Sequence, residues 1–245
     1  MLMSLQRVLV PCVVALLLSA CTTVQPPRGD TDALRGQGLP ASATAGVGWW
    51  TVAFRFAWPE GAEPAWYLDL LVADQVVRPA LEGHREAIPL WRIHRRAARD
   101  GAGHRFSFIF RSTPRDAARV YQTIRANPTL QRLRRRGRVE QVSYDDLGQI
   151  ARPGLADTSD RSWSEVMQRA WPPFIMGVSQ TWLDLIASVK RSRRWPAGLD
   201  AHWRAIAAEV DRIWQDEGGH ALLHHLNAVF GYRPVTVTTR GAMRF

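Results

Sequence analysis

The chain has 245 residues, of which 46% are hydrophobic and 11 are tryptophan, and this composition excludes a disordered protein. It carries 32 basic and 22 acidic residues, a formal net charge of +10 that indicates anionic partners. Its two cysteines, Cys12 and Cys21, both lie near the N-terminus, so a disulfide framework or a thiolate metal site is excluded from the rest of the chain.

The N-terminus has the pattern of a secretory signal. Arg7 supplies a short positive region, and residues 8–18 are almost wholly apolar. This run is shorter than the roughly 20 residues that a membrane-spanning helix needs. We therefore predict a signal peptide over residues 1–20 that is removed from the mature protein. There are two alternatives to a lipid-attached N-terminus: an ordinary signal peptide cut after Ala20, or an anchor that is not cleaved.

Leu18-Ser19-Ala20-Cys21 resembles a bacterial lipobox, in which the cysteine thiol is acylated and becomes the new N-terminus. The resemblance implies a bacterial lipoprotein held at a membrane through acylated Cys21. Thr22 follows the cysteine, and by analogy with lipoprotein sorting it implies the outer membrane. We expect the domain to face the periplasm, and the alternative is that it faces the outside of the cell. Outside the cytoplasm the anionic partners are lipid phosphates, acidic glycans or acidic proteins rather than nucleic acid.

Residues 21–48 are rich in Pro, Gly, Ala, Ser and Thr and are typical of a flexible tether. From Trp49 the pattern changes, because apolar and other residues alternate with the period of a half-buried strand. The apolar members are Trp50, Val52, Phe54 and Phe56. A helix with a kink or break at Pro79 is predicted after Pro64.

The next 60 residues predict two more strands, a helix and a fourth strand. The strands are expected at Leu90–Arg96, at His104–Arg111 after an Asp100–Gly103 hairpin turn, and at Arg138–Tyr144. The helix begins with Thr113 as its cap and Pro114 in its first turn, is interrupted near Asn127-Pro128, and stops at Gly137.

This order, strand–helix–strand–strand–helix–strand, predicts an α+β fold with a ferredoxin-like split βαβ sheet over residues 49–146. In that arrangement the first and third strands are central, and these two carry the apolar stripes. The second and fourth strands would be edges, and they carry charged residues such as Arg92 and Glu140.

After a linker at Asp145–Arg161, residues 162–245 are predicted to form a helical C-terminal segment. Ser162 with Glu165 suggests a capping box for a first helix, and a second helix would bury its apolar stripe. That stripe is Phe174, Ile175, Val178, Trp182, Leu185, Ile186 and Val189.

A third helix would be capped by Asp200, bury Trp203 and Trp214, and break at Gly218-Gly219. A fourth is expected over His220–Phe230, followed by a short strand at Pro234–Thr239.

His220, His224 and His225 form the sharpest pattern that could carry chemistry. Histidines at positions i and i+4 share a helix face and can chelate zinc. However, His220 and His224 lie opposite the apolar stripe of their helix, and a solvated helix face explains this position better than a metal site does. We predict no metal, no cofactor and no catalytic residue, and keep a metal-dependent hydrolase of envelope polymers as the alternative function.

A basic patch is predicted on the sheet face that points away from the helices, because side chains alternate between the two faces of a strand. The predicted anion-binding residues are Arg55, Arg92, His94, Arg105 and Arg111. Guanidinium groups on neighbouring strands repel one another unless an acid, solvent or an anionic ligand relieves them. The alternative is that the C-terminal helices cover this face and that acids such as Asp184 or Glu209 neutralise the arginines.

The sequence therefore predicts an outer-membrane lipoprotein that binds or scaffolds an anionic envelope component without catalysis. The component would be a lipid phosphate, an acidic glycan or an acidic partner protein.

Overall fold

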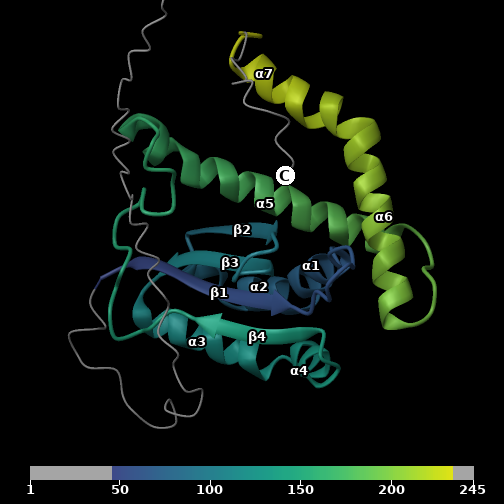
Figure 1. Ribbon diagram of the computed structural model, residues 1–245. Helices are drawn as coiled ribbons and strands as arrows, with labels where there is room; N and C mark the ends of the chain where they lie inside the picture. The colour runs from purple at the N-terminus through teal and green to yellow at the C-terminus, as the bar shows by residue number, and fades with distance from the viewer. Residues whose placement is uncertain (1–45, 234–245) are drawn as a thin grey trace, which may run out of the picture. The chain divides into compact units, whose positions relative to one another are not determined.

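A computed structural model describes residues 46–233 of the chain. The signal peptide, Cys21, most of the predicted tether and the predicted strand at Pro234–Thr239 lie outside the described residues. The described part is a mixed α+β structure (Figure 1). No helix within residues 46–233 combines the length and apolar character required to cross a bilayer.

Four antiparallel strands form one sheet. They are β1 (Gly48–Phe56), β2 (Leu90–Ala97), β3 (His104–Ser112) and β4 (Val139–Tyr144), in the spatial order β2-β3-β1-β4. The first and third strands are central and the second and fourth are edges, as predicted. In the β1–β3 register Val52 faces Phe108 and Phe54 faces Phe106. The predicted apolar stripes therefore lie side by side on one face of the sheet, the helix face.

The predicted helix after Pro64 continues past Pro79 with a change of helical type. It comprises α1 (Tyr67–Val72), a π-helical segment η2 (Ala73–Val77) and α2 (Arg78–Gly83), and the short 3₁₀ helix η3 (Arg85–Ala87) follows. Proline inside an α-helix lacks an N–H donor and clashes with the carbonyl four residues earlier. The wider π turn immediately before Pro79 accommodates this, so the helix neither ends nor breaks there.

The second helical region has the predicted cap at Thr113 and the predicted interruption near Asn127-Pro128. Thr113 accepts a hydrogen bond from the Asp116 backbone N–H at 3.2 Å and begins α3 (Pro114–Ala126). Asn127 ends α3 and begins α4 (Pro128–Arg135), because its side-chain oxygen accepts from the N–H groups of Thr129 and Leu130. Gly137 follows with φ +65, the left-handed conformation that lets the chain turn into β4.

A single hydrophobic core lies between the helix face and the helices. Its largest buried side chains on the sheet are Trp50, Phe54, Phe56, Phe106, Phe108 and Phe110. Helices α1, α2, α3 and α4 contribute Leu68, Leu71, Ala80, Val120, Ile124, Leu130 and Leu133. The C-terminal helices belong to the same core through Leu183, Ile186, Trp203 and Ile206.

The predicted linker after β4 has no regular structure, but it packs against one end of the opposite sheet face. The Trp49 indole N–H donates to the carbonyls of Gly154 and Leu155 at 3.0 and 3.1 Å. Ile150 contacts Gly48 so closely that a Cβ on Gly48 would lie 2.3 Å from it. This segment therefore covers the half of the face that starts at Trp49.

One helix, α5 (Glu165–Ser192), replaces the two helices predicted there, and Pro172 and Pro173 lie inside it. The capping box at Ser162 is also wrong, since the cap is Ser164, whose hydroxyl accepts from the Met167 N–H at 3.3 Å. The predicted buried stripe is partly wrong too, because Phe174 and Val178 are both 46% exposed.

Helix α5 lies along β2 (Figure 1), and the Ser179 hydroxyl accepts a hydrogen bond from the Ile93 backbone N–H at 3.1 Å. The free edge of the sheet at β2 is thereby covered, as edge strands generally need.

The last helical region also differs from the prediction. Helix α6 (Leu199–Gly218) passes without a break through a π-helical segment, η4 (Gly219–His224), into α7 (His225–Val229). Gly218 is buried against the Trp214 ring, and a Cβ on residue 218 would lie 2.8 Å from that ring. This glycine therefore makes room for the Trp214 side chain and does not end the helix. Asp200 lies inside the first turn of α6, and Gly198 is the residue before the helix. Trp214, predicted to be buried, is 53% exposed.

Candidate functional site

Three arginines form a row across the sheet, on the face opposite the helices. Arg105 on β3 is paired with Arg96 on one side and with Arg55 on the other. In the next row His94 is paired with Ser107. We call Arg96, Arg105 and Arg55 the arginine row. The alternation of side chains that places the phenylalanines in the core thus brings three guanidinium-bearing residues together.

Acids neutralise the two ends of the arginine row. Arg55 Nε lies 3.2 Å from a Glu140 carboxylate oxygen, and the pair is about half exposed. Arg96 forms an ion pair with Asp100 of the hairpin turn. Within residues 46–233, Arg105 in the centre forms no ion pair with an acid. The centre of the row therefore keeps a positive charge that is available to an anion.

His94 reports the electrostatic field of this cluster. Its pKa is lowered from 6.5 by partial loss of solvent and by the positive charges of Arg92, Arg96 and Arg105. These residues lie on β2 and β3, the two elements that carry the cluster. Loss of solvent is the larger cause, and the contribution of the three arginines shows that the ring lies in a positive potential, which is the property that attracts an anionic ligand.

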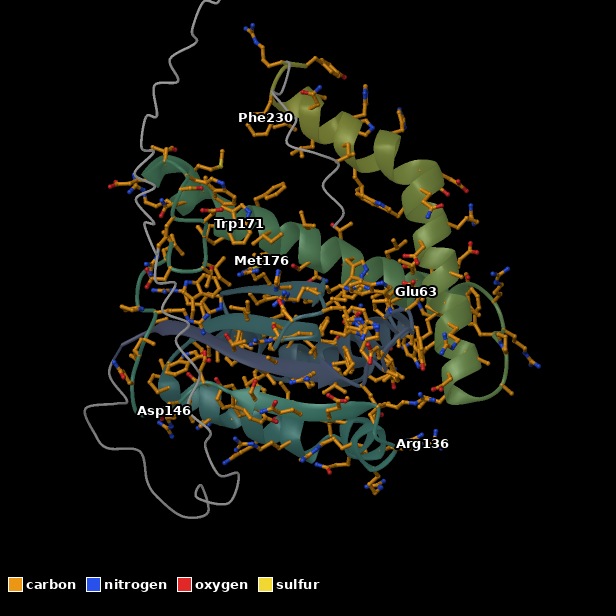
Figure 2. All side chains as sticks on the ribbon, in the orientation of Figure 1. Glu63, Arg136, Asp146, Trp171, Met176 and Phe230 are labelled. Atoms are coloured by element: carbon orange, nitrogen blue, oxygen red, sulfur yellow. The ribbon has the colours of Figure 1, made fainter. Side chains whose placement is uncertain are left out.

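Arg92 and Arg111 belong to the half of this face that the segment after β4 covers. Arg92 donates to the Thr158 carbonyl at 3.4 Å, and its guanidinium lies 5.0 Å from the centre of the Trp171 ring on α5. Figure 2 shows Trp171 in the N-terminal half of α5. Partial burial and the charge of Arg152 lower the pKa of Arg92 to about 10. Arg111 donates to the Pro153 carbonyl at 2.9 Å. Both residues hold the covering segment in place.

The C-terminal helices do not supply the neutralising acids considered from the sequence. Asp184 lies 3.4 Å from Arg78, and Glu209 pairs with Arg193 and Arg212. These arginines lie on α2, α5 and α6 or beside them, away from the arginine row. Of the predicted site residues, Arg55, His94 and Arg105 are thus grouped, Arg92 and Arg111 lie farther along the strands, and Cys21 lies outside the described residues.

Sequence reasoning missed a buried ionic cluster on the helix side of the sheet. Asp69 on α1 is completely buried, and its Oδ2 lies 3.0 Å from His104 Nε2 and 3.3 Å from a guanidinium nitrogen of Arg95. The Arg95 guanidinium lies between the rings of Trp66 and Trp182, at 5.1 and 4.9 Å. The cluster therefore links α1 to β2, β3 and α5.

The arrangement of this cluster suits a structural role better than catalysis. His104 is completely buried, and its ring packs against the rings of Phe56 and Trp66 at 4.8 and 4.9 Å. Within the described residues, His104 Nδ1 and Asp69 Oδ1 are buried without a hydrogen-bond partner. A general base must reach the proton that it abstracts, and these atoms have no contact with solvent. The sequence did contain a signal for this cluster, because Asp69 is an acid within the otherwise apolar run Tyr67–Val72, and a buried acid needs a partner.

The three histidines near the C-terminus lie close together but do not complete a metal site. The ring centres of His220 and His224 are 5.1 Å apart, and that of His225 is 5.4 Å from His220. In the part of the chain that the structure describes, no group of three or more His, Cys, Asp or Glu residues is placed to hold a metal ion. No described observation favours the metal-dependent hydrolase over the binding function.

Comparison of the chain with protein-family models, curated proteins and solved structures finds no match. Its function therefore has to be argued from the arginine row and its surroundings.

Proposed function

We propose that the protein is an outer-membrane lipoprotein whose α+β domain binds an anionic envelope component, without catalysis, at the arginine row. The component is a lipid phosphate, an acidic glycan or an acidic protein. The observation that carries the proposal is the position of Arg105, flanked by Arg55 and Arg96 and free of any acidic partner within residues 46–233. Guanidinium groups bind phosphate and carboxylate in a bidentate manner, so the row suits either group.

The sheet that presents this row is, we propose, a ferredoxin-like split βαβ sheet. The order of elements along the chain and the strand order β2-β3-β1-β4 support this assignment. Its consequence for function is that β1 and β3 are both central strands. The backbones of these strands are hydrogen-bonded on both sides, so Arg55 and Arg105 extend from a rigid part of the sheet at a fixed spacing.

Replacing Arg105 with glutamate tests the proposal. The probe is a set of vesicles of phosphatidylcholine with or without 30% phosphatidylglycerol, together with inorganic phosphate and a polyanionic glycan such as heparin. To remove any acyl group, all chains carry Cys21→Ser. We expect Arg105→Glu to weaken binding to at least one of these anions by ten-fold or more, and added salt to weaken the parent chain's binding in the same way.

Arg132→Glu on α4 is the matched control, since it makes the same change of charge on an exposed helix. Equal loss of binding in the two variants would mean that net charge alone attracts the anion, and it would overturn the proposed site. Binding that does not depend on salt, or that Arg105→Glu leaves unchanged, would also overturn it. Circular dichroism of both variants shows that the fold is retained.

A further inference from the structure

Exposed large apolar side chains within residues 46–233 gather on the C-terminal helices. Fourteen such side chains are exposed, and all except Val47 and Leu155 lie between Trp163 and Tyr232. These twelve lie on or beside three helical segments, and the five between Leu222 and Phe230 alone expose an apolar area on the order of 400 Å², if each side chain is about half exposed. The largest apolar patch of a typical soluble monomer is about 300–600 Å², and such a patch is often functional. This region therefore has the properties of an interaction surface.

Helix α5 carries one part of this surface. Met167, Phe174 and Val178 are 52%, 46% and 46% exposed. They occupy positions i, i+7 and i+11, which share one face of an α-helix. The buried residues Leu183 and Ile186 lie on a different face, against the core. Helix α5 is thus apolar on two sides, and within residues 46–233 one of them is left exposed.

The second part lies on residues 219–229, which comprise η4 and α7 and are called the arm here. Its exposed apolar residues recur at helical spacing, and the next residue, Phe230, continues the pattern. Those within the arm are Leu222, Leu223, Leu226 and Val229. Val229 is 83% exposed and Phe230 68%. The arm leaves α6 and turns back in the direction of α5, and Figure 2 shows Phe230 at its far end. Although α5 packs against α6, the exposures show that the arm does not bury its apolar side on α5 of the same chain.

We propose that the partner of this surface is a second copy of the chain, in a two-fold dimer where the arm of each copy packs on the exposed face of the other copy's α5. Two-fold symmetry makes each contact occur twice, so one arrangement covers both apolar stripes of both copies. A stable interface needs about 800 Å² from each partner, and the eight exposed apolar side chains of the α5 face and the arm, counted with Phe230, supply roughly 600–700 Å² before any polar rim is counted.

Charge favours a protein partner over an anionic bilayer. Near the start of α5, where the apolar side chains are most exposed, Asp157, Asp160 and Glu165 outnumber Arg161 and Arg169. Anionic lipids would be repelled there. Residues 219–229 contain no acid and are followed by Arg233, so the polar side of the arm does not repel the acidic start of α5 in another copy. The proposal depends neither on the lipid anchor nor on the arginine row.

Disulfide cross-linking between differently tagged chains gives a direct test, because Cys12 and Cys21 are the protein's two cysteines. Both are first changed to serine in the full chain. One chain then carries Phe174→Cys and the other Leu226→Cys, and the two are mixed and oxidised. We expect a disulfide-linked heterodimer on a non-reducing gel. Gln180→Cys, on the opposite side of α5, replaces Phe174→Cys in the matched control and should give much less product.

The chain that carries only the two cysteine-to-serine changes has an unaltered apolar surface. Light scattering of this parent chain should report twice the chain mass of 27.6 kDa at micromolar concentration. Leu226→Glu changes an exposed residue and should give a folded monomer. A monomer for the parent chain would overturn the proposal, as would equal cross-linking in the Gln180→Cys control. A chain carrying both Phe174→Cys and Leu226→Cys that closes only on itself would show that the arm binds α5 of its own copy, which also overturns it.

Discussion

Arg55 and Arg105 lie directly opposite each other in the β1–β3 pair, so the two central strands place like charges side by side. Such a pair is unfavourable in a sheet unless the charge is compensated. Glu140 compensates Arg55, and the register between β1 and β4 shifts between Arg55 and Phe56, next to this contact. The sheet therefore tolerates Arg105 without an acid of its own within the described residues.

Replacing Glu140 with glutamine should strengthen anion binding and weaken the fold slightly. The change releases Arg55 from its acid and raises the positive charge of the row, so we expect a several-fold lower Kd for vesicles containing phosphatidylglycerol. The ion pair is exposed, so the free energy of unfolding should fall by less than about 1 kcal/mol. Vesicle titration and urea denaturation measure the two effects. Weaker anion binding in this variant would contradict the role assigned to Arg55.

The titration of His94 should respond to an anion at the row. Its pKa is lowered in the folded chain, so the neutral form is favoured. The neutral ring of His94 therefore favours the folded chain at pH values above about 6.5, the pKa of histidine in the unfolded chain. This stabilisation is lost as the pH falls through the lower pKa that His94 has in the folded chain. Inorganic phosphate should raise the pKa of His94, because it offsets the neighbouring arginines.

NMR titration of the histidine ring protons measures this shift. His84 is a convenient internal reference, since its ring lies 2.9 Å from the Thr123 hydroxyl on the helix side of the molecule. A His94 titration that phosphate does not move, or one that moves equally for both histidines, would contradict a local anion site.

Asp69→Ala should destabilise the protein strongly. The substitution leaves the Arg95 guanidinium and the His104 ring without their buried acceptor. Removing one partner from a buried ion pair typically costs about 3 kcal/mol or more. Asp184→Ala is the control, because that acid is exposed and should matter by less than about 1 kcal/mol. Equal denaturation midpoints for the two variants would show that the cluster does not stabilise the fold.

Cys21→Ser should release the protein from the membrane fraction of cells. One acyl chain gives only marginal binding, and stable attachment needs more than one, as a triacylated cysteine would provide. Cell fractionation with immunoblotting compares the parent chain with the variant, and Cys12→Ser serves as the control. A parent chain found in the soluble fraction would contradict lipid attachment.

Local patterns in the sequence were sufficient for the strands and for several helix ends. Alternation of apolar side chains predicts β1 and β3, because a strand with one buried face has a period of two, and the order of the elements along the chain predicts their central position. Thr113 and Asn127 mark helix starts, because their side chains bond to N–H groups only two or three residues away. Such signals need no knowledge of distant parts of the chain.

Other features depend on contacts between distant residues, and no local pattern encodes them. Gly218 predicts a helix break by propensity, yet the helix continues through it, and the Trp214 ring occupies the space that a side chain on residue 218 would need. The sequence by itself determined the four strands, the helix start at Thr113 and an excess of arginine on the face away from the core. Only the tertiary structure decided that Asp69 joins Arg95 and His104, and that Arg105 is left without an acid within residues 46–233. The reason is that pairing depends on strand register and helix packing, which bring together residues many positions apart.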